Sequence, residues 1–346
     1  MRIEEHYSLE NHNTFRLPVK ARRFMEYANE EELLHMLGDA SFRGSDSLHI
    51  GSGSNLLFLD HYNGIILHSA IRGVELVEET ARTVLLRIGA GEPWDAVVAF
   101  AVSMGWYGIE NLSGIPGEAG AAAVQNIGAY GVELKDAVET VEARSRRNLQ
   151  PRTFTREACR YAYRRSRFKE EEESGNPYIV THLSLRLRKT PCLRLDYAGL
   201  EEFITRRYPS VGLSEVREGI LSLRKEKLPD PAQCGNAGSF FMNPILSAPH
   251  FDALRRQYPA MPFFRAGEEA VKIPAGWLIE QCGFKGKSFG RVGVYEKQAL
   301  VLVNLGGAGG EEIARLADCI RGEVFGRFGI ALTPEVRYIG IRRLPE

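Results

Sequence analysis

Two glycine-rich segments constrain this chain more than any other feature of its sequence. The first is GSGSN at 51–55, and the second is GIPGEAGAAAVQNIGAYG at 114–131, with five glycines in 18 residues. Small residues let backbone N–H groups approach a ligand closely, and successive N–H groups in such turns bind anions. One such segment alone is more often a turn between strands. Two together favour a cradle for a dinucleotide, although they do not name it.

The common phosphate-binding motifs do not match. The motif G-x-G-x-x-G fails in GSGSNL because Leu56 stands at the third glycine position. Gly286-Lys287-Ser288 resembles the end of a P-loop, but Gln281 stands where that loop needs its first glycine.

Composition excludes several classes of protein. A length of 346 residues allows two or three domains, and 44 basic residues balance 44 acidic ones, so no bulk positive field attracts nucleic acid. The longest apolar run, 96–102, is too short to span a bilayer, and the N-terminal residues lack the apolar core of a secretion signal. The five cysteines and eight histidines show no metal-ligand spacing. We expect a cytoplasmic protein with no nucleic-acid partner, no membrane insertion and no metal site.

Hydrophobic periodicity predicts an α+β fold. Helices are expected near 30–38, 94–104, 249–257, 275–283 and 311–329, and strands at three stretches of 64–90, at 137–145, 178–188 and 299–304, and in the last piece, 332–340. Changes of texture along the chain predict four parts: 1–68, 69–222, 223–334 and a final strand segment, 335–346, which packs back on an earlier part.

Three polar residues are candidates for chemistry. Ser239 lies among small residues in GNAGSFFMNP, where its hydroxyl is either a proton relay or a turn hydrogen bond. The segment RYAYRRSRFK at 160–169 is either a solvated basic strand or the source of an inward arginine that clamps a carboxylate or phosphate. Glu335 is either a surface residue or an acid–base group.

Taken together, ten segments in the same order resemble the UDP-N-acetylenolpyruvoylglucosamine reductases (UDP-N-acetylmuramate dehydrogenases, the MurB family). The matching segments are 13–18, 51–58, 89–94, 110–134, 161–169, 227–231, 235–244, 275–286, 298–304 and 334–340. The resemblance covers nearly the whole chain.

The resemblance implies a fold, a cofactor and a reaction. The fold has two α+β subdomains of the vanillyl-alcohol-oxidase type, at 1–68 and 69–222, which bind FAD, and a C-terminal α+β substrate domain at 223–334. FAD is expected to be non-covalent, and NADPH is expected to reduce it. The implied reaction is reduction of UDP-N-acetylglucosamine enolpyruvate to UDP-N-acetylmuramate in peptidoglycan precursor synthesis, by a monomer.

The resemblance also implies roles for individual residues. Ser239 would protonate the substrate carbanion, and Arg164 and Glu335 would polarise the carboxylate and stabilise the enolate. Substrate contacts are implied for Tyr163, Tyr197, Lys227, Asn243, Lys285 and Gln298, with Tyr197 marking the long form of the family. FAD contacts are implied for Gly51, Ser52, Gly53, Ser54, Asn55, Gly114, Ile115, Pro116, Gly117, Gly120, Ala121, Ala122, Gln125, Asn126 and Gly128.

One departure and two alternatives stay open. Ala121 and Ala122 stand where family members often carry serines, so backbone N–H groups would have to hold the pyrophosphate. The first alternative is a sugar or alcohol oxidase of the same fold, which would reoxidise with oxygen. The second is a non-catalytic sensor of nucleotide sugars.

Overall fold

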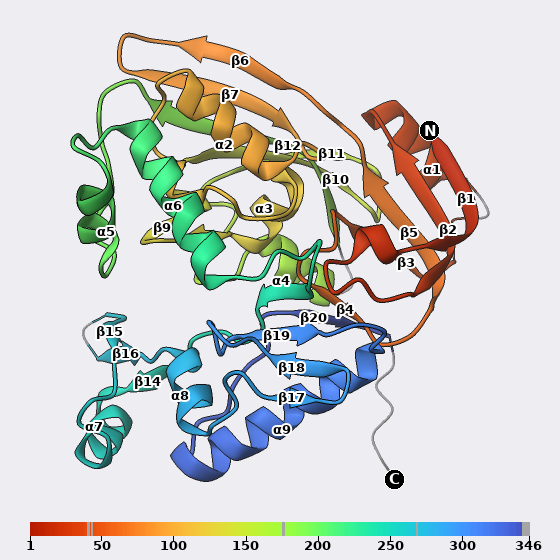
Figure 1. The fold of residues 1–346 in the computed structure, drawn as a ribbon. Helices are drawn as coiled ribbons and strands as arrows, with labels where there is room; N and C mark the ends of the chain where they lie inside the picture. The colour runs from red at the N-terminus through yellow and green to blue at the C-terminus, as the bar shows by residue number, and fades with distance from the viewer. Residues whose placement is uncertain (40–41, 43, 175–176, 268, 341–346) are drawn as a thin grey trace. The chain divides into compact units, whose positions relative to one another are not determined.

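The computed structural model describes residues 1–39, 42, 44–174, 177–267 and 269–340 (Figure 1). Contacts divide the chain into two compact units, each assembled from segments that are distant in sequence. Unit 1 comprises Met1–Tyr7, Ala21–Ser52 and Asn63–Arg224, and unit 2 comprises Ser8–Lys20, Gly53–Tyr62 and Lys225–Glu346. The boundary between the units therefore falls inside the first glycine-rich segment.

An antiparallel five-stranded sheet forms the centre of unit 1. Its order is β11-β10-β12-β7-β6, with the strands Pro151–Thr155, Val138–Ser145, Tyr178–Arg188, Thr83–Gly89 and Val74–Glu79. Alternate residues of β7 are buried, as the period of a strand predicts. They share one apolar core with α2 (Trp94–Ser103), α3 (Ala119–Gln125) and α4 (Arg167–Glu173).

A four-stranded sheet with one helix completes the N-terminal part of unit 1. Its order is β1-β2-β5-β3, with the strands Arg2–Ser8, Lys20–Tyr27, Tyr62–Ser69 and Ser47–Ile50. Helix α1 (Glu30–Gly38) begins after Asn29, whose side chain accepts the backbone N–H of Glu32.

The remaining elements of unit 1 are short or lie at its end. Helices α5 (Leu200–Arg207) and α6 (Leu213–Lys227) bury their apolar faces in a core of their own. Short elements connect the rest: β8 (Gly128–Ala129), β9 (Val132–Glu133) and the 3₁₀ helices Glu110–Leu112 and Leu134–Asp136.

The described residues of unit 2 form small sheets, three α-helices and one 3₁₀ helix. One sheet has the order β13-β19-β18-β17, with Gly235–Ser239, Val301–Asn304, Val292–Val294 and Ser288–Phe289, and α9 (Gly310–Phe328) runs along it (Figure 1). A second has the order β14-β16-β15, with Ile245–Ser247, Ala270–Lys272 and Phe264–Arg265, and α7 (Ala248–Gln257) follows β14. Unit 2 also contains α8 (Ala275–Gln281), the 3₁₀ helix Glu10–His12, and the parallel pair β20 (Arg337–Ile339) and β4 (Leu56–Phe58).

Most predicted elements are confirmed, and three expectations need correction. All five predicted helices form, within two residues of the expected ends. The segment 160–169 is not a basic strand: it makes a tight turn and then begins α4. The strand expected over 332–340 shrinks to Arg337–Ile339. The sequence analysis predicted neither α5 nor α6. No helix in the described part of the chain is long and apolar enough to cross a membrane.

Candidate active site

The first glycine-rich segment, 51–55, connects β3 to β4. Gly53 has a φ of +71°, and a Cβ placed there would lie 1.9 Å from the carbonyl oxygen of His12, so only glycine fits. Within the described residues, no backbone N–H group of 51–55 donates a hydrogen bond to the protein. Consecutive unpaired N–H donors on a loop are the arrangement that binds phosphate oxygens.

Two hydrogen bonds from Trp94 hold the second glycine-rich segment, 114–131, and Leu112 just before it. The indole N–H of Trp94 donates to the Leu112 carbonyl over 3.0 Å, and its backbone N–H donates to the Gly117 carbonyl over 3.0 Å. A Cβ at Gly120 would lie 2.8 Å from the Cβ of Ala90, so this glycine is needed for helix α3 to approach the sheet. The segment is thus fixed before any ligand binds.

Asp95 fixes the start of the same segment. Its Oδ1 accepts the backbone N–H of Gly114 over 2.6 Å, and its two oxygens accept the Arg217 guanidinium over 2.7 and 2.8 Å. Burial by itself raises the pKa of Asp95, but the hydrogen bonds from Arg217 and Gly114 outweigh it and lower the pKa. Nε of Arg224 donates to the Gly114 carbonyl over 3.0 Å.

The two glycine-rich segments lie against each other at Gly51. A Cβ placed there would lie 3.0 Å from Oε2 of Glu118 and 3.3 Å from the Cβ of Ala121. In the part of the chain that the structure describes, the N–H groups of Ile115, Gly117, Glu118 and Ala121 also donate no hydrogen bond to the protein. Small side chains and unpaired backbone donors on both segments fit the pyrophosphate of a dinucleotide. No serine hydroxyl at 121 or 122 is needed to supply donors.

The side chain of Asn126, one of the residues expected to contact FAD, is bound by protein groups. The residue is completely buried at the left-handed end of α3. Its Nδ2 donates to Oε2 of Glu133 over 2.9 Å and to the Ala162 carbonyl over 3.0 Å, and its Oδ1 accepts the Lys135 N–H over 3.0 Å. Both N–H groups of this amide and one lone pair of its Oδ1 are therefore used by the protein.

Arg164 is held in a strained turn next to this amide. Ala162 and Arg165 exchange both backbone hydrogen bonds, and Arg164 between them has a φ of +57°. Its Nη2 donates to the Gly128 carbonyl over 2.9 Å, and its guanidinium carbon lies 5.3 Å from the ring centroid of Tyr163. A left-handed arginine persists only where its surroundings fix it, and such strain concentrates at functional sites. Arg164, Tyr163 and Gly128 thus form one group in unit 1.

Ser239 is turned outward by a β-bulge in unit 2. Asn236 opposes Val303 and Ser239 opposes Val301, so two residues of β13 face one of β19. Gly238 inside the bulge has a φ of +67°. Ser239 is exposed, and its hydroxyl makes no hydrogen bond within the described residues. The bulge therefore presents a hydroxyl that no protein group uses.

Glu335 lies beside Ser239 in the same unit. Its backbone N–H donates over 2.8 Å to the carbonyl of Phe240, which is the residue after Ser239. In the same way, the Met242 N–H donates to the Thr333 carbonyl over 2.9 Å. The carbonyl of Glu335 accepts Nδ2 of Asn55, the last residue of the first glycine-rich segment, over 3.0 Å. Ser239 and Glu335 are thus brought together by main-chain contacts, and Arg164 belongs to the other unit.

The tyrosine implied to close over substrate packs on the second glycine-rich segment. The rings of Tyr197 and Tyr130 meet edge to face, with centroids 5.6 Å apart. Asn111, completely buried, donates from Nδ2 to the carbonyls of Tyr130 and Arg194, each over 2.8 Å. Sequence reasoning missed this tether, although Asn111 stands three residues before the segment in ENLSGIPG.

Two predicted substrate residues meet at the start of α8. Oδ1 of Asn243 accepts the Ala275 N–H over 2.9 Å, and Oε1 of Gln298 accepts the Leu300 N–H over 3.3 Å. Neither side-chain NH₂ group donates a hydrogen bond to any described residue. Both amides are therefore oriented by the protein and keep their donors for a ligand.

The two predicted substrate lysines are more loosely placed. Lys285 follows α8 and its Nζ lies 3.0 Å from Oε1 of Glu280. Lys227 is the last residue of α6 and is exposed. Neither lysine is brought next to Ser239 by a described hydrogen bond.

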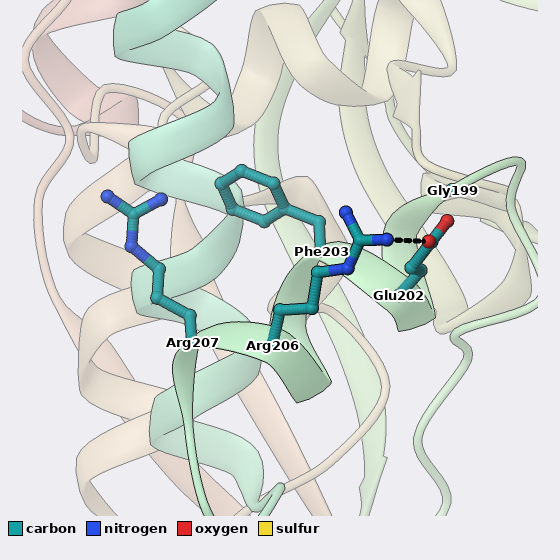
Figure 2. A pocket seen from close by; sticks show the side chains of 5 residues that line it. All are labelled: Gly199, Glu202, Phe203, Arg206 and Arg207. Atoms are coloured by element: carbon teal, nitrogen blue, oxygen red, sulfur yellow. Dashed lines mark hydrogen bonds and ion pairs between the residues drawn. The ribbon is translucent and has the colours of Figure 1, made fainter.

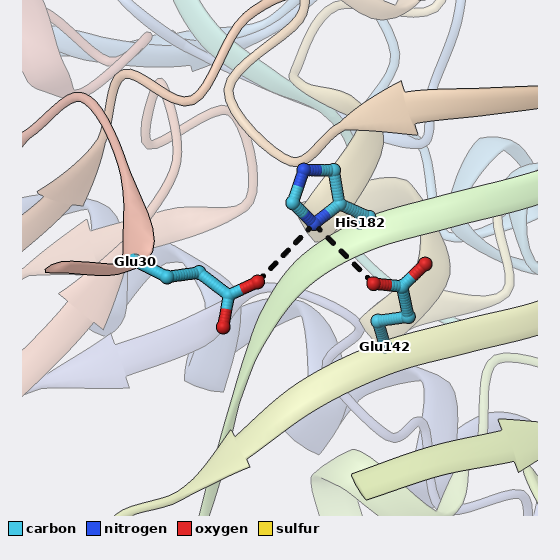
Figure 3. Close-up of side chains that lie close together, drawn as sticks. All are labelled: Glu30, Glu142 and His182. Carbon is cyan, nitrogen blue, oxygen red and sulfur yellow. Dashed lines mark ion pairs between the residues drawn. The ribbon is translucent and has the colours of Figure 1, made fainter. Parts of the chain in front are cut away.

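Glu30, Glu142 and His182 form a cluster of potential metal ligands in unit 1 (Figure 3). Nδ1 of His182 lies 3.8 Å from Glu30 and 3.7 Å from Glu142. Each carboxylate already pairs with an arginine: Arg144 contacts Glu30, and Arg87 donates twice to Glu142 over 2.7 Å. The two guanidinium groups supply the positive charge that a cation would bring, so the cluster is a structural ion-pair network.

A pocket of about 360 Å³ lies on α5, and no predicted site residue lines it (Figure 2). It is lined by Gly199, Glu202, Phe203, Arg206 and Arg207. Arg206 pairs with Glu202, and the Arg207 guanidinium carbon lies 5.1 Å from the Phe203 ring centroid. The lining charges are exposed and pair with one another, so the pocket is assigned no role.

Comparison with known sequences matches two parts of the chain to family models. Residues 21–145 match an FAD binding domain, and residues 230–339 match the C-terminal domain of UDP-N-acetylenolpyruvoylglucosamine reductase. A reductase of that name from Bacteroides fragilis is 49% identical over 339 residues, covering 97% of this chain and 100% of the relative. One from Pseudomonas aeruginosa is 41% identical over 336 residues, covering 97% of this chain and 98% of the relative.

A solved structure shares the fold over the full length. The crystal structure of the reductase of the same family from Thermus caldophilus matches with a TM-score of 0.69 at 23% identity, covering 98% of this chain and 99% of that chain. The predicted α+β FAD-binding fold is therefore confirmed.

Proposed function

Because the chain belongs to the UDP-N-acetylenolpyruvoylglucosamine reductase family, we propose that Arg164, Ser239 and Glu335 catalyse that family's reaction here. The enzyme is an FAD-dependent oxidoreductase that reduces UDP-N-acetylglucosamine enolpyruvate with NADPH. The product, UDP-N-acetylmuramate, is a precursor of peptidoglycan.

FAD is held by the two glycine-rich segments. The unpaired backbone N–H groups of 51–55 and of 115–121 support this assignment, because they supply donors for a pyrophosphate without any basic side chain. The cofactor contacts are assigned to Gly51, Ser52, Gly53, Ser54, Asn55, Gly114, Ile115, Pro116, Gly117, Gly120, Ala121, Ala122, Gln125 and Gly128, with Asn126 contributing only by support. When bound, FAD would supply the hydride chemistry that links oxidation of NADPH to reduction of the enol ether.

The three proposed catalytic residues bind the substrate carboxylate, stabilise the negative charge that develops on the substrate, and donate a proton to it. Arg164 binds the substrate carboxylate, for which a guanidinium offers a bidentate fit. Glu335 stabilises the negative charge that develops next to that carboxylate. Ser239 donates the proton to the carbon adjacent to the carboxylate, which completes the reduction.

One observation carries this assignment: the bulge at Gly238 exposes the Ser239 hydroxyl while Glu335 is bound to the next residue, Phe240. A proton donor and a carboxyl group on adjoining backbone segments suit a carbanion that must be stabilised and then protonated.

Substrate binding is assigned to side chains that keep free donors. The NH₂ groups of Asn243 and Gln298 suit sugar and phosphate oxygens, and Lys227 and Lys285 suit the diphosphate. Tyr163 lies beside Arg164, and Tyr197 closes over the UDP part from the loop before α5.

An anaerobic half-reaction experiment tests the proposal. The protein is reduced with NADPH, then UDP-N-acetylglucosamine enolpyruvate is added while flavin absorbance near ~450 nm is followed. We expect bleaching and then recovery, and Ser239→Ala should slow only the recovery, by about 10²- to 10⁴-fold. Recovery with oxygen alone indicates an oxidase, and the absence of a flavin band after FAD addition indicates a nucleotide-sugar sensor.

We further propose a cytoplasmic monomer with four sequence parts: 1–68, 69–222, 223–334 and 335–346. The parallel pairing of β20 with β4 supports the return of the last segment to the first part.

A further inference from the structure

A buried histidine bridges two carboxylates in unit 1, and the proposed mechanism uses none of them. His68 on β5 is 6% exposed. Its Nδ1 lies 2.8 Å from Oε2 of Glu26 on β2, and its Nε2 lies 3.0 Å from Oε1 of Glu118. The two carboxylates therefore contact the two nitrogens of one ring. Both ring nitrogens can donate hydrogen bonds at the same time only when the ring is protonated, as an imidazolium.

Through Glu118, this cluster contacts both glycine-rich segments. Glu118 belongs to the second segment and is 7% exposed. Its second oxygen, Oε2, lies 3.0 Å from the position that a Cβ would take at Gly51, the first residue of the first segment. A carboxylate is therefore buried immediately behind the backbone donors that are proposed to hold the pyrophosphate of FAD.

An uncompensated carboxylate at this place would oppose an anionic ligand, because charges interact strongly in a low-dielectric interior. His68 supplies the compensating charge. Burial by itself lowers the pKa of His68, but the hydrogen bonds and charges of Glu118 and Glu26 outweigh it, and the pKa is raised.

The other groups around His68 do not replace it. Its ring stacks on Phe24 with centroids 5.9 Å apart, and Arg2 on β1 interacts with Glu26, not with Glu118. His49 on the neighbouring strand β3 is neutral, because burial and then the charge of His68 lower its pKa to about 3. Tyr27 binds His49 with its hydroxyl, over 2.7 Å, and burial keeps the phenol protonated.

We propose that His68, as an imidazolium between Glu26 and Glu118, is a positioning residue for FAD: it neutralises Glu118 and holds the second glycine-rich segment against the first at Gly51. This inference rests on the proposed placement of FAD on those segments. Loss of the proton leaves the buried carboxylate of Glu118 and the partly buried carboxylate of Glu26 facing a neutral ring, which disfavours both the packing at Gly51 and a bound anion.

The sign of the pH dependence follows from linkage. A histidine whose pKa is raised in the folded protein contributes fully below its ordinary pKa of about 6.5, and the contribution is lost as pH rises through the raised pKa. Above that point, the dissociation constant of FAD should rise by up to about tenfold per pH unit.

The test is release of FAD from the holoprotein on dilution, followed by flavin fluorescence at several values from about pH 6.5 to about pH 9.5. We expect the wild-type dissociation constant to rise with pH. His68→Gln should bind FAD weakly at all pH values, whereas Glu118→Gln, which keeps a hydrogen-bonding group without the charge, should bind with a flat pH profile. The exposed His35 on α1 provides a matched control, because His35→Gln should follow the wild type.

Each outcome decides the inference. A flat wild-type profile, or His68→Gln with wild-type affinity and profile, overturns it. If His68→Gln does not fold, the wild-type and Glu118→Gln profiles still decide, since a rise that persists in Glu118→Gln excludes this carboxylate. A wild-type protein that binds no FAD at any pH contradicts the proposed function instead, which is a different result.

Discussion

The side-chain amide of Asn55 donates a hydrogen bond to the backbone carbonyl of Glu335 over 3.0 Å, across 280 positions of sequence. In return, the carbonyl of Asn55 accepts the backbone N–H of Arg337 over 3.0 Å. The last residue of a proposed cofactor segment therefore fixes the backbone of a proposed catalytic residue, so changes at one should be felt at the other.

Replacing Asn55 with alanine should reveal this link. Asn55→Ala removes the donor to Glu335, so we expect a loss of about 1 kcal/mol in the free energy of unfolding and slower recovery of the flavin by substrate. Denaturant unfolding and the anaerobic half-reaction measure the two effects. Asn63→Ala, at an exposed position of β5, is the control and should change neither. An unchanged recovery rate in Asn55→Ala would show that the Glu335 carbonyl needs no such anchor.

The bulge that presents Ser239 can be tested through Gly238. A Cβ at Gly238 meets no atom within 4 Å, so Gly238→Ala adds only the strain of a φ of +67°. That strain is about 1–2 kcal/mol and is relieved only by moving the bulge. We expect slower substrate-driven recovery with unchanged NADPH reduction.

Gly322→Ala is the matched control for this experiment. Gly322 also has open space, but it lies in α9 without a positive φ, so alanine should stabilise the protein by up to about 1 kcal/mol. Equal recovery rates in both variants would mean that the aim of Ser239 does not depend on the bulge.

Arg164 should need its guanidinium and not only its charge. Arg164→Lys loses the hydrogen bond to Gly128 and the bidentate fit to a carboxylate, so substrate-driven recovery should slow by about 10- to 100-fold. NADPH reduction should stay unchanged. Arg165→Lys, in the same turn but exposed and paired with Glu170, is the control. If the two variants behave alike, Arg164 does not contact the substrate.

The contribution of Asp95 to stability should depend on pH in a known direction. Its pKa is lowered in the folded protein, so its stabilising effect is complete above the ordinary value of about 3.9 and disappears as pH falls through the lowered pKa. Asp95→Asn should therefore be less stable than the wild type near neutral pH, and the difference should shrink below about pH 4. Urea unfolding at several pH values measures it, and a constant difference would exclude the charge of Asp95 as the cause.

The elements that the sequence predicted well are those whose information is local. The alternation in 178–188 and the apolar face of 311–329 depend on neighbours a few residues apart, and both elements form there. The apolar spacing of α6, in Val216, Ile220 and Leu223, is equally local, although no helix was predicted there.

The family's motifs identified residues, but not how the protein holds them. Asn126 is a member of a glycine-rich motif, yet its amide is consumed by Glu133, Ala162 and Lys135. Only the fold shows that this amide supports the turn of Arg164.

The sequence by itself determined the α+β class and the two glycine-rich segments, because strand and helix periods and glycine clusters depend on neighbouring positions. The resemblance to the family named the candidate site residues. The tertiary structure alone decided that Gly51 lies against Glu118, that the buried His68 lies between Glu26 and Glu118, and that Asn55 fixes Glu335. These contacts join residues 42 to 280 positions apart. Burial makes such polar contacts strong and specific, but no local pattern records which distant partner a buried group will meet.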